Sequence, residues 1–377
     1  MGRFSDALRG PGLHAIAEVK RRSPSAGDLR PEADPAILAP ALEEGGAAAL
    51  SILVDERFGG SIDDLVTARA VTALPLLAKG FFRSGAQLEE LRQAGADAVL
   101  LLLRDLDDGQ ASALMARAAA LGLDALVEAH DEEELDRAVR LGANPIGVNA
   151  RDLDSFRIDR PAQLRLVERA PRDRIVVAES GIAARVHAAA AELAGADAML
   201  VGSALMKAPD PRAKLAELLR RPLVKVCGLT RPEDVMVAAE AGADMAGFIL
   251  AAESPRRAAE VLPVPDTMLS VAVLVGDLAD PGADLVQLYG REKGHRARDA
   301  VLLRNGKRVA KVFDLPWQES DPLHLDRARV ASGRVMLAGG LAADNIRAAI
   351  EAVRPWAVDA ASRLEASPGI KDPDLVR

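Results

Sequence analysis

The sequence has little cysteine and few aromatic residues, and both shortages limit what the protein can be. Cys227 is the single cysteine among 377 residues, so an internal disulfide and a cysteine-based zinc site are both excluded. The five histidines show no HExxH-type spacing, which disfavours a metal site. Aromatic residues contribute 3% of the chain against 49% hydrophobic residues in all. The core is therefore expected to pack through aliphatic side chains and close helix contacts.

Long hydrophobic runs and basic runs are also missing. No apolar run has the length of a membrane span, and the start of the chain, MGRFSDALRG, lacks the apolar core of a signal peptide. Lysine and arginine number 48 against 56 acidic residues, a net charge of −8, and no basic stretch could follow a phosphate backbone. We expect neither a membrane nor nucleic acid as a partner, and a cytoplasmic enzyme that acts on small molecules.

From Leu13 onward, short aliphatic runs alternate with amphipathic helical stretches, which is typical of βα units around a parallel sheet. Eight such units fit within about 220 residues, the length that a closed (β/α)8 barrel, or TIM barrel, needs. The predicted strands are HAIAEVK, AALSILV, LPLLAKG, AVLLLL, DALVEAH, PIGVNAR, IVVAES and AMLVGSA.

The pattern restarts at Arg221-Pro222, which predicts two domains, residues 1–220 and 221–377. Eight strands can be counted again, but several connections are too short for helices, so the sequence predicts a second, reduced TIM barrel with parts of its outer ring missing. Its predicted strands are LVKVCGLT, ADMAGFIL, MLSVAVLV, ADLVQLYG, RVAKVFDL, PLHLDRA, RVMLAGGL and WAVDAAS.

Charged residues end many of the first eight strands. The carboxyl ends of parallel strands lie on one side of the molecule, so these residues should converge on one opening. Lysines and carboxylates at such a rim can hold acid and base in opposite protonation states. A ring of structural ion pairs explains the same pattern equally well. The residues concerned are Glu18, Lys20, Lys79, Glu128, Asn149, Arg151 and Glu179.

The last two of these strands lead into glycine-containing loops, ESGI and VGSALM. A phosphate site in a TIM barrel commonly forms there, from backbone N–H groups and a helix N-terminus. Gly181 and Gly202 would allow close backbone approach, and Ser203 could donate its hydroxyl. The other interpretation is that the glycines only serve the turns.

Seven motifs in order across residues 14–219 resemble indole-3-glycerol phosphate synthase: IAEVKRRSPSAG, LSILVDERFGGS, LLAKGF, LVEAHDEEEL, GVNARDL, VVAESGI and LVGSALMKAPDP. The resemblance implies ring closure of a carboxyphenylamino-deoxyribulose phosphate to an indole, with loss of carbon dioxide and water and with no cofactor. Lys79 matches the general acid of that family and Glu128 its partner in dehydration. The remaining matches are Glu18, Lys20 and Asn149 as groups that orient the substrate, Glu179 and Ser180 in the pocket wall, and Ser23, Arg151, Gly181, Gly202 and Ser203 as substrate and phosphate contacts.

Two departures from that family stand out. Gly80 replaces the aspartate of the usual KDF motif, and only FSDAL remains of a longer amino-terminal helix that normally helps to cover the substrate. The resemblance therefore implies weaker substrate binding.

The motifs LVKVCGLTRPEDV, GADMAGFILAAESPR, LVQLYG, LAGGLAADNI and ASPGIKD resemble phosphoribosylanthranilate isomerase, which carries out an Amadori rearrangement. Cys227 matches the base of that family and Arg256 the arginine that meets the anthranilate carboxylate. The acid of the family ends strand six, and LDRARVASG assigns it to Asp326. Gly339, Gly340 and Ser362 match the phosphate loops.

Other positions in this second half depart from the isomerase pattern. Arg363 stands where the family has a glycine in a phosphate loop, and Tyr289 stands where it usually has histidine. Three interpretations stay open: a bifunctional tryptophan-biosynthesis enzyme acting on phosphorylated small molecules, a synthase with a degenerate second barrel, and a non-catalytic sugar-phosphate binder. Two sites on one chain leave no need for a dimer, which is compatible with a monomer, but the sequence does not fix the oligomeric state.

Overall fold

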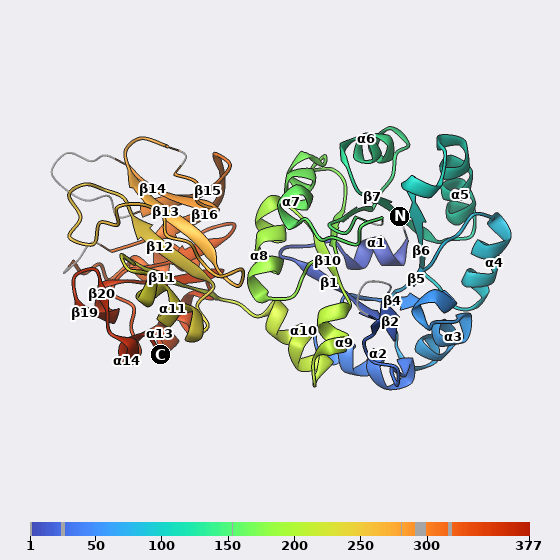
Figure 1. Ribbon diagram of the computed structural model, residues 1–377, viewed down its shortest axis with the longest axis horizontal. Helices are drawn as coiled ribbons and strands as arrows, with labels where there is room; N and C mark the ends of the chain where they lie inside the picture. The colour runs from blue at the N-terminus through green and yellow to red at the C-terminus, as the bar shows by residue number, and fades with distance from the viewer. Residues whose placement is uncertain (1, 24–26, 153, 280, 291–298, 316–318) are drawn as a thin grey trace. The chain divides into compact units, whose positions relative to one another are not determined.

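A computed structural model describes residues 2–23, 27–152, 154–279, 281–290, 299–315 and 319–377. The chain divides into two compact units, Met1–Leu219 and Arg220–Arg377, each of which contains one closed barrel. Figure 1 shows both units with their strands and helices labelled.

The first unit is the predicted (β/α)8 barrel. Its eight barrel strands pair in parallel around a closed ring, which confirms the eight strands predicted for this half. They are β1 (His14–Val19), β4 (Ala49–Leu53), β5 (Leu76–Lys79), β6 (Ala98–Leu102), β7 (Asp124–Ala129), β8 (Ile146–Asn149), β9 (Val176–Glu179) and β10 (Ala198–Val201).

Helices surround this barrel in Figure 1. Several begin at an aspartate or serine whose side chain accepts a backbone N–H of the first turn, as Asp107 and Ser84 do, and this cap satisfies a group that would otherwise lack a partner. The helices are α2 (Pro35–Glu44), α3 (Ile62–Val71), α4 (Gly85–Gln93), α5 (Asp108–Ala120), α6 (Glu132–Arg140), α7 (Arg160–Arg169), α8 (Arg185–Ala194), α9 (Ser203–Lys207) and α10 (Pro211–Leu219). Short elements between them are β2 (Arg22–Ser23), β3 (Gly27–Asp28), η1 (Glu56–Phe58) and η2 (Leu103–Asp105).

Strand alternation places charged residues directly above an apolar layer inside the barrel. In β1, Ala15, Ala17 and Val19 pack outward among the helix-facing residues, whereas Ile16 belongs to the interior cluster. Because successive side chains point to opposite faces, the residue two positions beyond Ile16 also points inward, and this residue is Glu18. The same step leads from other interior aliphatic residues to charged ones: Leu77 to Lys79, Leu126 to Glu128, and Val177 to Glu179.

The amino-terminal helix α1 (Arg3–Ala7) lies at the amino ends of the strands, away from this charged rim. The backbone N–H groups of Gly2 and Ser5 donate to the two carboxylate oxygens of Asp124, at the start of β7, over 2.8 and 2.9 Å. Phe4 and Leu8 are fully buried within the interior cluster. This segment therefore closes the bottom of the barrel and does not cover the opening at which the charged residues gather.

The second unit is also a closed eight-stranded barrel. Its strands are β11 (Leu223–Cys227), β12 (Met245–Ile249), β13 (Leu269–Val275), β14 (Leu285–Tyr289), β15 (Asp299–Arg304), β16 (Lys307–Phe313), β17 (Val335–Leu337) and β18 (Ala357–Ala360). Strands β15 and β16 form a hairpin, and β15 is antiparallel to both of its neighbours. The other neighbouring pairs are parallel.

Two predictions about these strands were wrong. PLHLDRA is not a strand, since residues 324–329 form α12 (His324–Arg329). The strand that the prediction missed is β15, whose sequence DAVLLR runs into the turn Asn305-Gly306. Both turn residues have positive φ, 47° and 74°, the conformation that Asn-Gly adopts in two-residue hairpins, and this dipeptide was the available signal.

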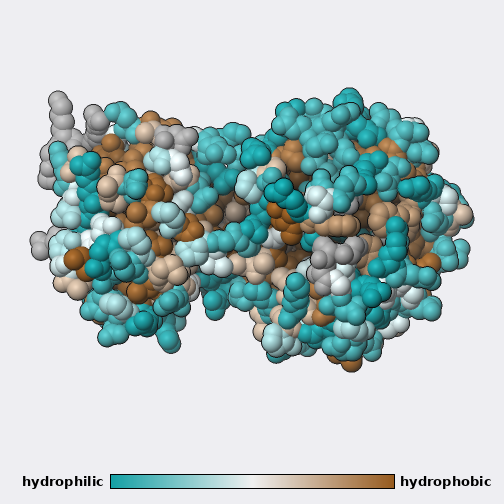
Figure 2. All heavy atoms as spheres, in the orientation of Figure 1, coloured by the Kyte–Doolittle hydropathy of each residue, from teal (hydrophilic) through white to brown (hydrophobic). Residues whose placement is uncertain are grey.

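Fewer helices surround the second barrel, as predicted. In the described part of this unit they are α11 (Pro232–Glu240), α12, α13 (Ile346–Val353) and α14 (Pro373–Val376), with a short η3 (Ser362–Leu364) and the strands β19 (Glu365–Ser367) and β20 (Ile370–Lys371). Hydrophobic atoms are visible on the surface of this unit in Figure 2. Val275 and Leu278, at and just after the end of β13, are among the large hydrophobic residues that remain exposed.

None of the helices in the described ranges is long and apolar enough to span a membrane.

Burial of α1 yields a stability prediction. Phe4→Ala removes a fully buried ring and leaves a cavity at the bottom of the first barrel, so we expect it to lower the free energy of unfolding by about 3–5 kcal/mol. Ile37, on α2, is 70% exposed, and Ile37→Ala serves as the control with a change under about 0.5 kcal/mol. Denaturant unfolding followed by circular dichroism measures both. Equal, small losses would contradict the anchoring role of α1.

Candidate active sites

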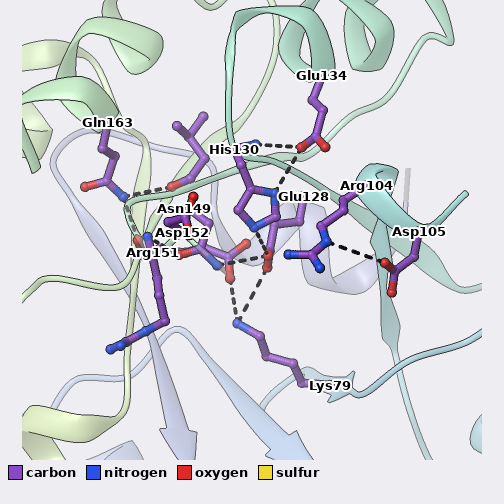
Figure 3. Close-up of polar contacts among 12 residues, drawn as sticks. Lys79, Arg104, Asp105, Glu128, His130, Glu134, Asn149, Arg151, Asp152 and Gln163 are labelled. Atoms are coloured by element: carbon purple, nitrogen blue, oxygen red, sulfur yellow. Dashed lines mark hydrogen bonds and ion pairs between the residues drawn. The ribbon is translucent and has the colours of Figure 1, made fainter. Parts of the chain in front are cut away.

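Lys79 is the centre of the rim of the first barrel. Its ammonium lies 2.6 Å from Oε2 of Glu179, 3.6 Å from Oε2 of Glu18 and 3.9 Å from Oε2 of Glu128. All three carboxylates are buried, and they come from three different strands. Figure 3 shows the Lys79 ammonium facing Glu128. The predicted convergence of these residues on one opening is therefore present in the structure.

Charge complementarity controls the protonation states in this cluster. Burial disfavours an ammonium, but the three carboxylates outweigh it and raise the pKa of Lys79 well above its usual range. Burial also opposes ionisation of Glu18, but Lys20 at 2.5 Å, together with Lys79, lowers its pKa. Lys79 is thus held in its charged, protonated form.

Glu179 differs from the other two carboxylates. Burial raises its pKa, the nearby Glu128 raises it further, and the Lys79 ammonium only partly opposes both effects. Of the three acids around Lys79 it is the most easily protonated. The cluster therefore contains carboxyl groups with pKa values displaced in opposite directions, an arrangement suited to acid and base roles in one site.

His130 was not predicted, and it holds Glu128 from behind. Its Nε2 is 3.0 Å from Oε1 of Glu128, and its Nδ1 is 3.0 Å from Oε2 of Glu134, which lies in the first turn of α6 (Figure 3). Although burial opposes its charge, the two carboxylates raise the pKa of His130 to about 10. Burial likewise opposes the charge on Glu128, but His130 and Lys79 bring the pKa of Glu128 down to about 2. The signal in the sequence was the spacing of His130 and Glu134 across the start of a helix.

Asn149 and Gln163 form hydrogen bonds that connect the carboxyl ends of β7, β8 and β9. The Asn149 side-chain amide donates to Oε1 of Glu128 at 2.9 Å and accepts from the backbone N–H of Arg151 at 2.9 Å. Gln163, on α7, donates to the carbonyls of Val148 and Glu179 over 2.8 and 2.6 Å, so it ties together the carboxyl ends of β8 and β9. Gln163 was not predicted either, because a single glutamine within an amphipathic helix carries no distinctive pattern.

Two carboxylate oxygens in this cluster have no hydrogen-bond donor among the residues that the structure describes. They are Oε2 of Glu128 and Oε1 of Glu179, both buried. Gly147 and Gly202 make room for this arrangement, because a Cβ on Gly147 would collide with Oε1 of Glu179 and one on Gly202 with Oε1 of Glu18.

The loops after β9 and β10 lie at the same rim. Ser180 and Gly181 both have positive φ, 66° and 75°, so the chain turns sharply directly after Glu179. Ser203 is the first residue of the short helix α9, which follows Gly202. Ser23 is buried in β2, which forms a small hairpin with β3 beyond the end of β1. These residues border the charged cluster on strands β9, β10 and β1.

The rim of the second barrel contains Cys227 at the end of β11. Cys227 and Lys225 are two residues apart and both buried, so they point into the barrel together. Gly247, the neighbour of Cys227 on β12, leaves space for them, since a Cβ there would approach Sγ of Cys227 to 2.7 Å. Burial raises the pKa of the Cys227 thiol, and Lys225 offsets this only in part.

Asp326 does not lie where the sequence interpretation required. It is on helix α12, its side chain is 61% exposed, and it pairs with Arg329 at 3.0 Å. The sixth strand of this barrel is β16, and the residue that follows it is Asp314. Asp314 is buried and accepts a hydrogen bond from the Tyr289 hydroxyl at 2.7 Å. Asp326 fails as the strand-six residue because the chain there forms a helix.

Arg256 forms an ion pair with Glu365, near the end of the chain, and Lys371 contacts the same carboxylate. Its Nε lies 2.8 Å from Oε2 of Glu365, and Oε1 of Glu365 accepts from Lys371 at 3.0 Å. Burial lowers the pKa of Lys371 despite this contact. The Glu365 carboxylate thus orients the Arg256 guanidinium. Gly228 leaves room beside it, since a Cβ there would lie 3.2 Å from Cδ of Arg256.

The phosphate-loop candidates lie near one another. Gly339 and Gly340 have positive φ, 100° and 63°, directly after the strand β17 and Ala338, and Ser362 begins η3 after β18. Arg363 donates to both carboxylate oxygens of Asp344, over 2.9 and 2.7 Å, and to the carbonyl of Gly340 at 3.3 Å. Its charge is therefore paired with Asp344 at the surface, where both groups are exposed.

In the described part of the chain, no group of three or more histidine, cysteine, aspartate or glutamate side chains is arranged to hold a metal ion.

Comparison with protein families gives the first barrel its identity. Residues 2–218 match the model of indole-3-glycerol phosphate synthase, which is more than half of the chain. The chain belongs to the indole-3-glycerol phosphate synthase family. Residues 317–377 match the model of N-(5'-phosphoribosyl)anthranilate isomerase. The protein therefore joins a synthase barrel to an isomerase-type carboxyl-terminal unit, the fused arrangement that the sequence motifs indicated.

Curated relatives agree with the assignment of the synthase barrel. The indole-3-glycerol phosphate synthase of Mycobacterium ulcerans is 48% identical over 214 residues, covering 56% of this chain and 79% of that protein. Indole-3-glycerol phosphate synthase 2 of Streptomyces coelicolor is 49% identical over 217 residues, covering 57% and 84%. Among solved structures, phosphoribosyl anthranilate isomerase from Thermus thermophilus matches at 26% identity and a TM-score of 0.35, covering 41% of this chain and 95% of that one.

The ion pairs of His130 predict a pH dependence of stability. Its pKa is raised from the ordinary 6.5 to about 10 in the folded state, so its contribution is fully present below pH 6.5 and is lost as the pH rises towards 10. We expect His130→Gln to remove up to about 4–5 kcal/mol from the free energy of unfolding at neutral pH and to flatten its decline between these values. His14→Gln, at the amino end of β1, is the control. Parallel pH profiles for the wild type and His130→Gln would contradict the assignment.

Proposed function

We propose that the synthase barrel converts 1-(2-carboxyphenylamino)-1-deoxyribulose 5-phosphate to indole-3-glycerol phosphate, a carbon–carbon lyase reaction of tryptophan biosynthesis. The observation that carries this proposal is the buried Lys79 ammonium among three carboxylates at the rim of a barrel of the synthase family. A sugar-phosphate binder would need no buried proton donor of this kind. A cytoplasmic location, and small phosphorylated molecules as its only ligands, belong to the same proposal.

The chemistry follows from the charges. The ring carbon that bears the carboxylate attacks the ketose carbonyl, and Lys79 donates a proton to the carbonyl oxygen as the new carbon–carbon bond forms. Carbon dioxide then leaves, and the electron pair of the broken carbon–carbon bond stays with the ring. In the dehydration that follows, one carboxyl group protonates the departing hydroxyl and another removes the proton that the substrate loses, roles suited to Glu179, whose pKa is raised, and Glu128, whose pKa is lowered.

Lys20 and the glycine loops bind the two ends of the substrate. Lys20 pairs with Glu18 at 2.5 Å and remains 16% exposed, so it can meet the substrate carboxylate at the opening. Gly181, Gly202 and Ser203 are suited to the phosphate through backbone N–H groups and a hydroxyl. We assign Ser23, Ser180, Asn149 and Arg151 to the surrounding contacts with substrate.

We further propose that the second barrel isomerises N-(5-phosphoribosyl)anthranilate, an intramolecular oxidation–reduction whose product is the substrate of the synthase barrel. Cys227 would remove the proton from the carbon next to the amine-bearing carbon, and Asp314, in place of Asp326, would protonate the ring oxygen as the ring opens. Asp314 has the support of burial and of its position after the sixth strand. Arg256 is suited to the anthranilate carboxylate, and Gly339, Gly340 and Ser362 to the phosphate.

One observation favours a synthase with an inactive second barrel. The guanidinium of Arg363 stands at the proposed phosphate loop and is neutralised by Asp344, so it brings bulk without a free charge. Separate assays of the two reactions on the intact chain distinguish these candidates.

For the synthase reaction, Lys79→Met should reduce kcat by a factor on the order of 10²–10⁴, because it removes the proton donor. Lys214→Met removes a lysine of α10 that pairs with Glu217, outside the rim, and should leave indole formation unchanged. Steady-state indole-3-glycerol phosphate formation measures both. Turnover that survives Lys79→Met undiminished would rule out Lys79 as the acid.

For the isomerase reaction, Asp314→Asn should reduce turnover by a factor on the order of 10²–10⁴, whereas Asp326→Asn should leave it unchanged. The two changes are chemically identical, so the comparison tests position alone. Cys227→Ala should also abolish isomerisation, and indole formation should persist in all three variants. Absence of isomerase turnover in the unmutated chain would select the inactive-barrel alternative, and a loss in Asp326→Asn alone would restore the first assignment of the acid.

A further inference from the structure

A continuous chain of hydrogen bonds crosses the interior of the second barrel. Lys225 donates to Oδ2 of Asp359 at 2.7 Å and to Oε1 of Gln287 at 2.9 Å. Nε2 of Gln287 donates to the hydroxyl of Tyr289 at 2.8 Å, and that hydroxyl donates to Oδ2 of Asp314 at 2.7 Å. All five side chains are buried. We call this set of five residues the interior polar chain.

The donors and acceptors of the interior polar chain follow in order from Lys225. The Lys225 ammonium has only donors, so it must face the oxygen of the Gln287 amide, and the amide nitrogen must then face Tyr289. The phenol oxygen accepts from that nitrogen, which directs its one proton towards Asp314. Oδ2 of Asp314 is thus the acceptor of the Tyr289 hydroxyl.

Strand register explains why Tyr289 reaches Asp314 across an intervening strand. Tyr289 on β14 is paired with Ala300 on β15, and Ala300 with Val312 on β16, so the three residues form one buried row facing inward. Asp314 is two residues beyond Val312 and faces the same way. Because the side chain of Ala300 is only a methyl group, the larger ring of Tyr289 on the neighbouring strand has room beside it.

We propose that Tyr289 is a positioning residue for the isomerase reaction, which holds Oδ2 of Asp314 as an acceptor so that the transferable proton is carried by Oδ1. This inference rests on the proposed isomerase function. The group transferred is one proton, from Oδ1 of Asp314 to the ring oxygen of the substrate, and the carboxylate left behind keeps its hydrogen bond from Tyr289. Lys225, at the other end of the interior polar chain, lies beside Cys227, so one chain of contacts connects the proposed base and acid.

The test uses Tyr289→Phe in the intact chain. Loss of one hydrogen bond to a charged group should lower isomerase kcat by about 10- to 100-fold, with KM changed by less than about twofold, because the ring and its packing remain. Ser270→Ala is the matched control: it removes a buried hydroxyl that donates to Asp284 at 2.7 Å, at the amino end of β13. Both variants should unfold at similar temperatures and retain full synthase activity.

A second measurement needs no turnover. Tyr289 is the only tyrosine of the chain, so the near-ultraviolet absorbance of phenolate reports this residue alone. Phenolate formation beside the Asp314 carboxylate is opposed by charge repulsion, so the phenol should titrate at lower pH in Asp314→Asn than in the wild type.

The outcomes distinguish failure of the positioning role of Tyr289 from failure of the proposed isomerase function. Isomerase turnover that is equal in the wild type and Tyr289→Phe, or coincident phenol titrations in the wild type and Asp314→Asn, would overturn the positioning role. A KM effect without a kcat effect would also overturn it, by making Tyr289 a binding residue. No isomerase turnover in the unmutated chain would instead overturn the proposed function of the second barrel, and the catalytic role of Tyr289 with it.

Discussion

The structure of the first barrel is organised around one buried ammonium group. Removing the Lys79 cation from water costs several kcal/mol, and only the three carboxylates within 2.6 to 3.9 Å offset that cost. The carboxylates in turn require cations of their own, supplied by Lys20 for Glu18 and by His130 for Glu128. Lys79 and the three carboxylates each follow, by two positions in a strand, an aliphatic residue of the interior cluster. The apolar layer beneath excludes water from below, which keeps this charged cluster in a surrounding of low polarity.

The second barrel uses a buried lysine in a different way. Lys225 is completely inaccessible, and its donors are directed to Asp359 and Gln287 within the barrel. Asp359 and Cys227 raise its pKa although burial opposes the charge. Its N–H groups are therefore directed to partners inside the barrel, and it affects groups at the rim only through neighbouring side chains. In the synthase barrel the lysine itself lies at the opening, whereas in the second barrel the proposed acid and base lie at the opening and the lysine lies below them.

Much of this arrangement was predictable from sequence, because strand alternation and parallel topology are local rules with a global consequence. Runs such as LLAK and ALVE fixed both the strand and the side to which Lys79 and Glu128 point. What the rules missed were residues whose role depends on a neighbour distant in the chain: His130 behind Glu128, Gln163 across two strand ends, and Gly147 as the space for Glu179. The error at Asp326 had another cause. Without β15, RVAKVFDL counts as the fifth strand and the segment around Asp326 as the sixth; with the hairpin at Asn305-Gly306 included, RVAKVFDL is the sixth strand and Asp314 follows it.

The reversed strand β15 explains how the second barrel keeps its rim with fewer helices. Parallel neighbours need a crossover connection of a dozen or more residues, whereas antiparallel neighbours can be joined by two. The two-residue turn after Arg304 therefore requires β15 and β16 to run in opposite directions. Because β15 descends and β16 ascends, β16 ends on the same side as β11 and β17, and Asp314 emerges at the rim with Cys227. The reversal affects only the strand that contributes Ala300 to the inward row, and the hydrogen bond from Tyr289 to Asp314 passes over this small residue from β14 to the end of β16.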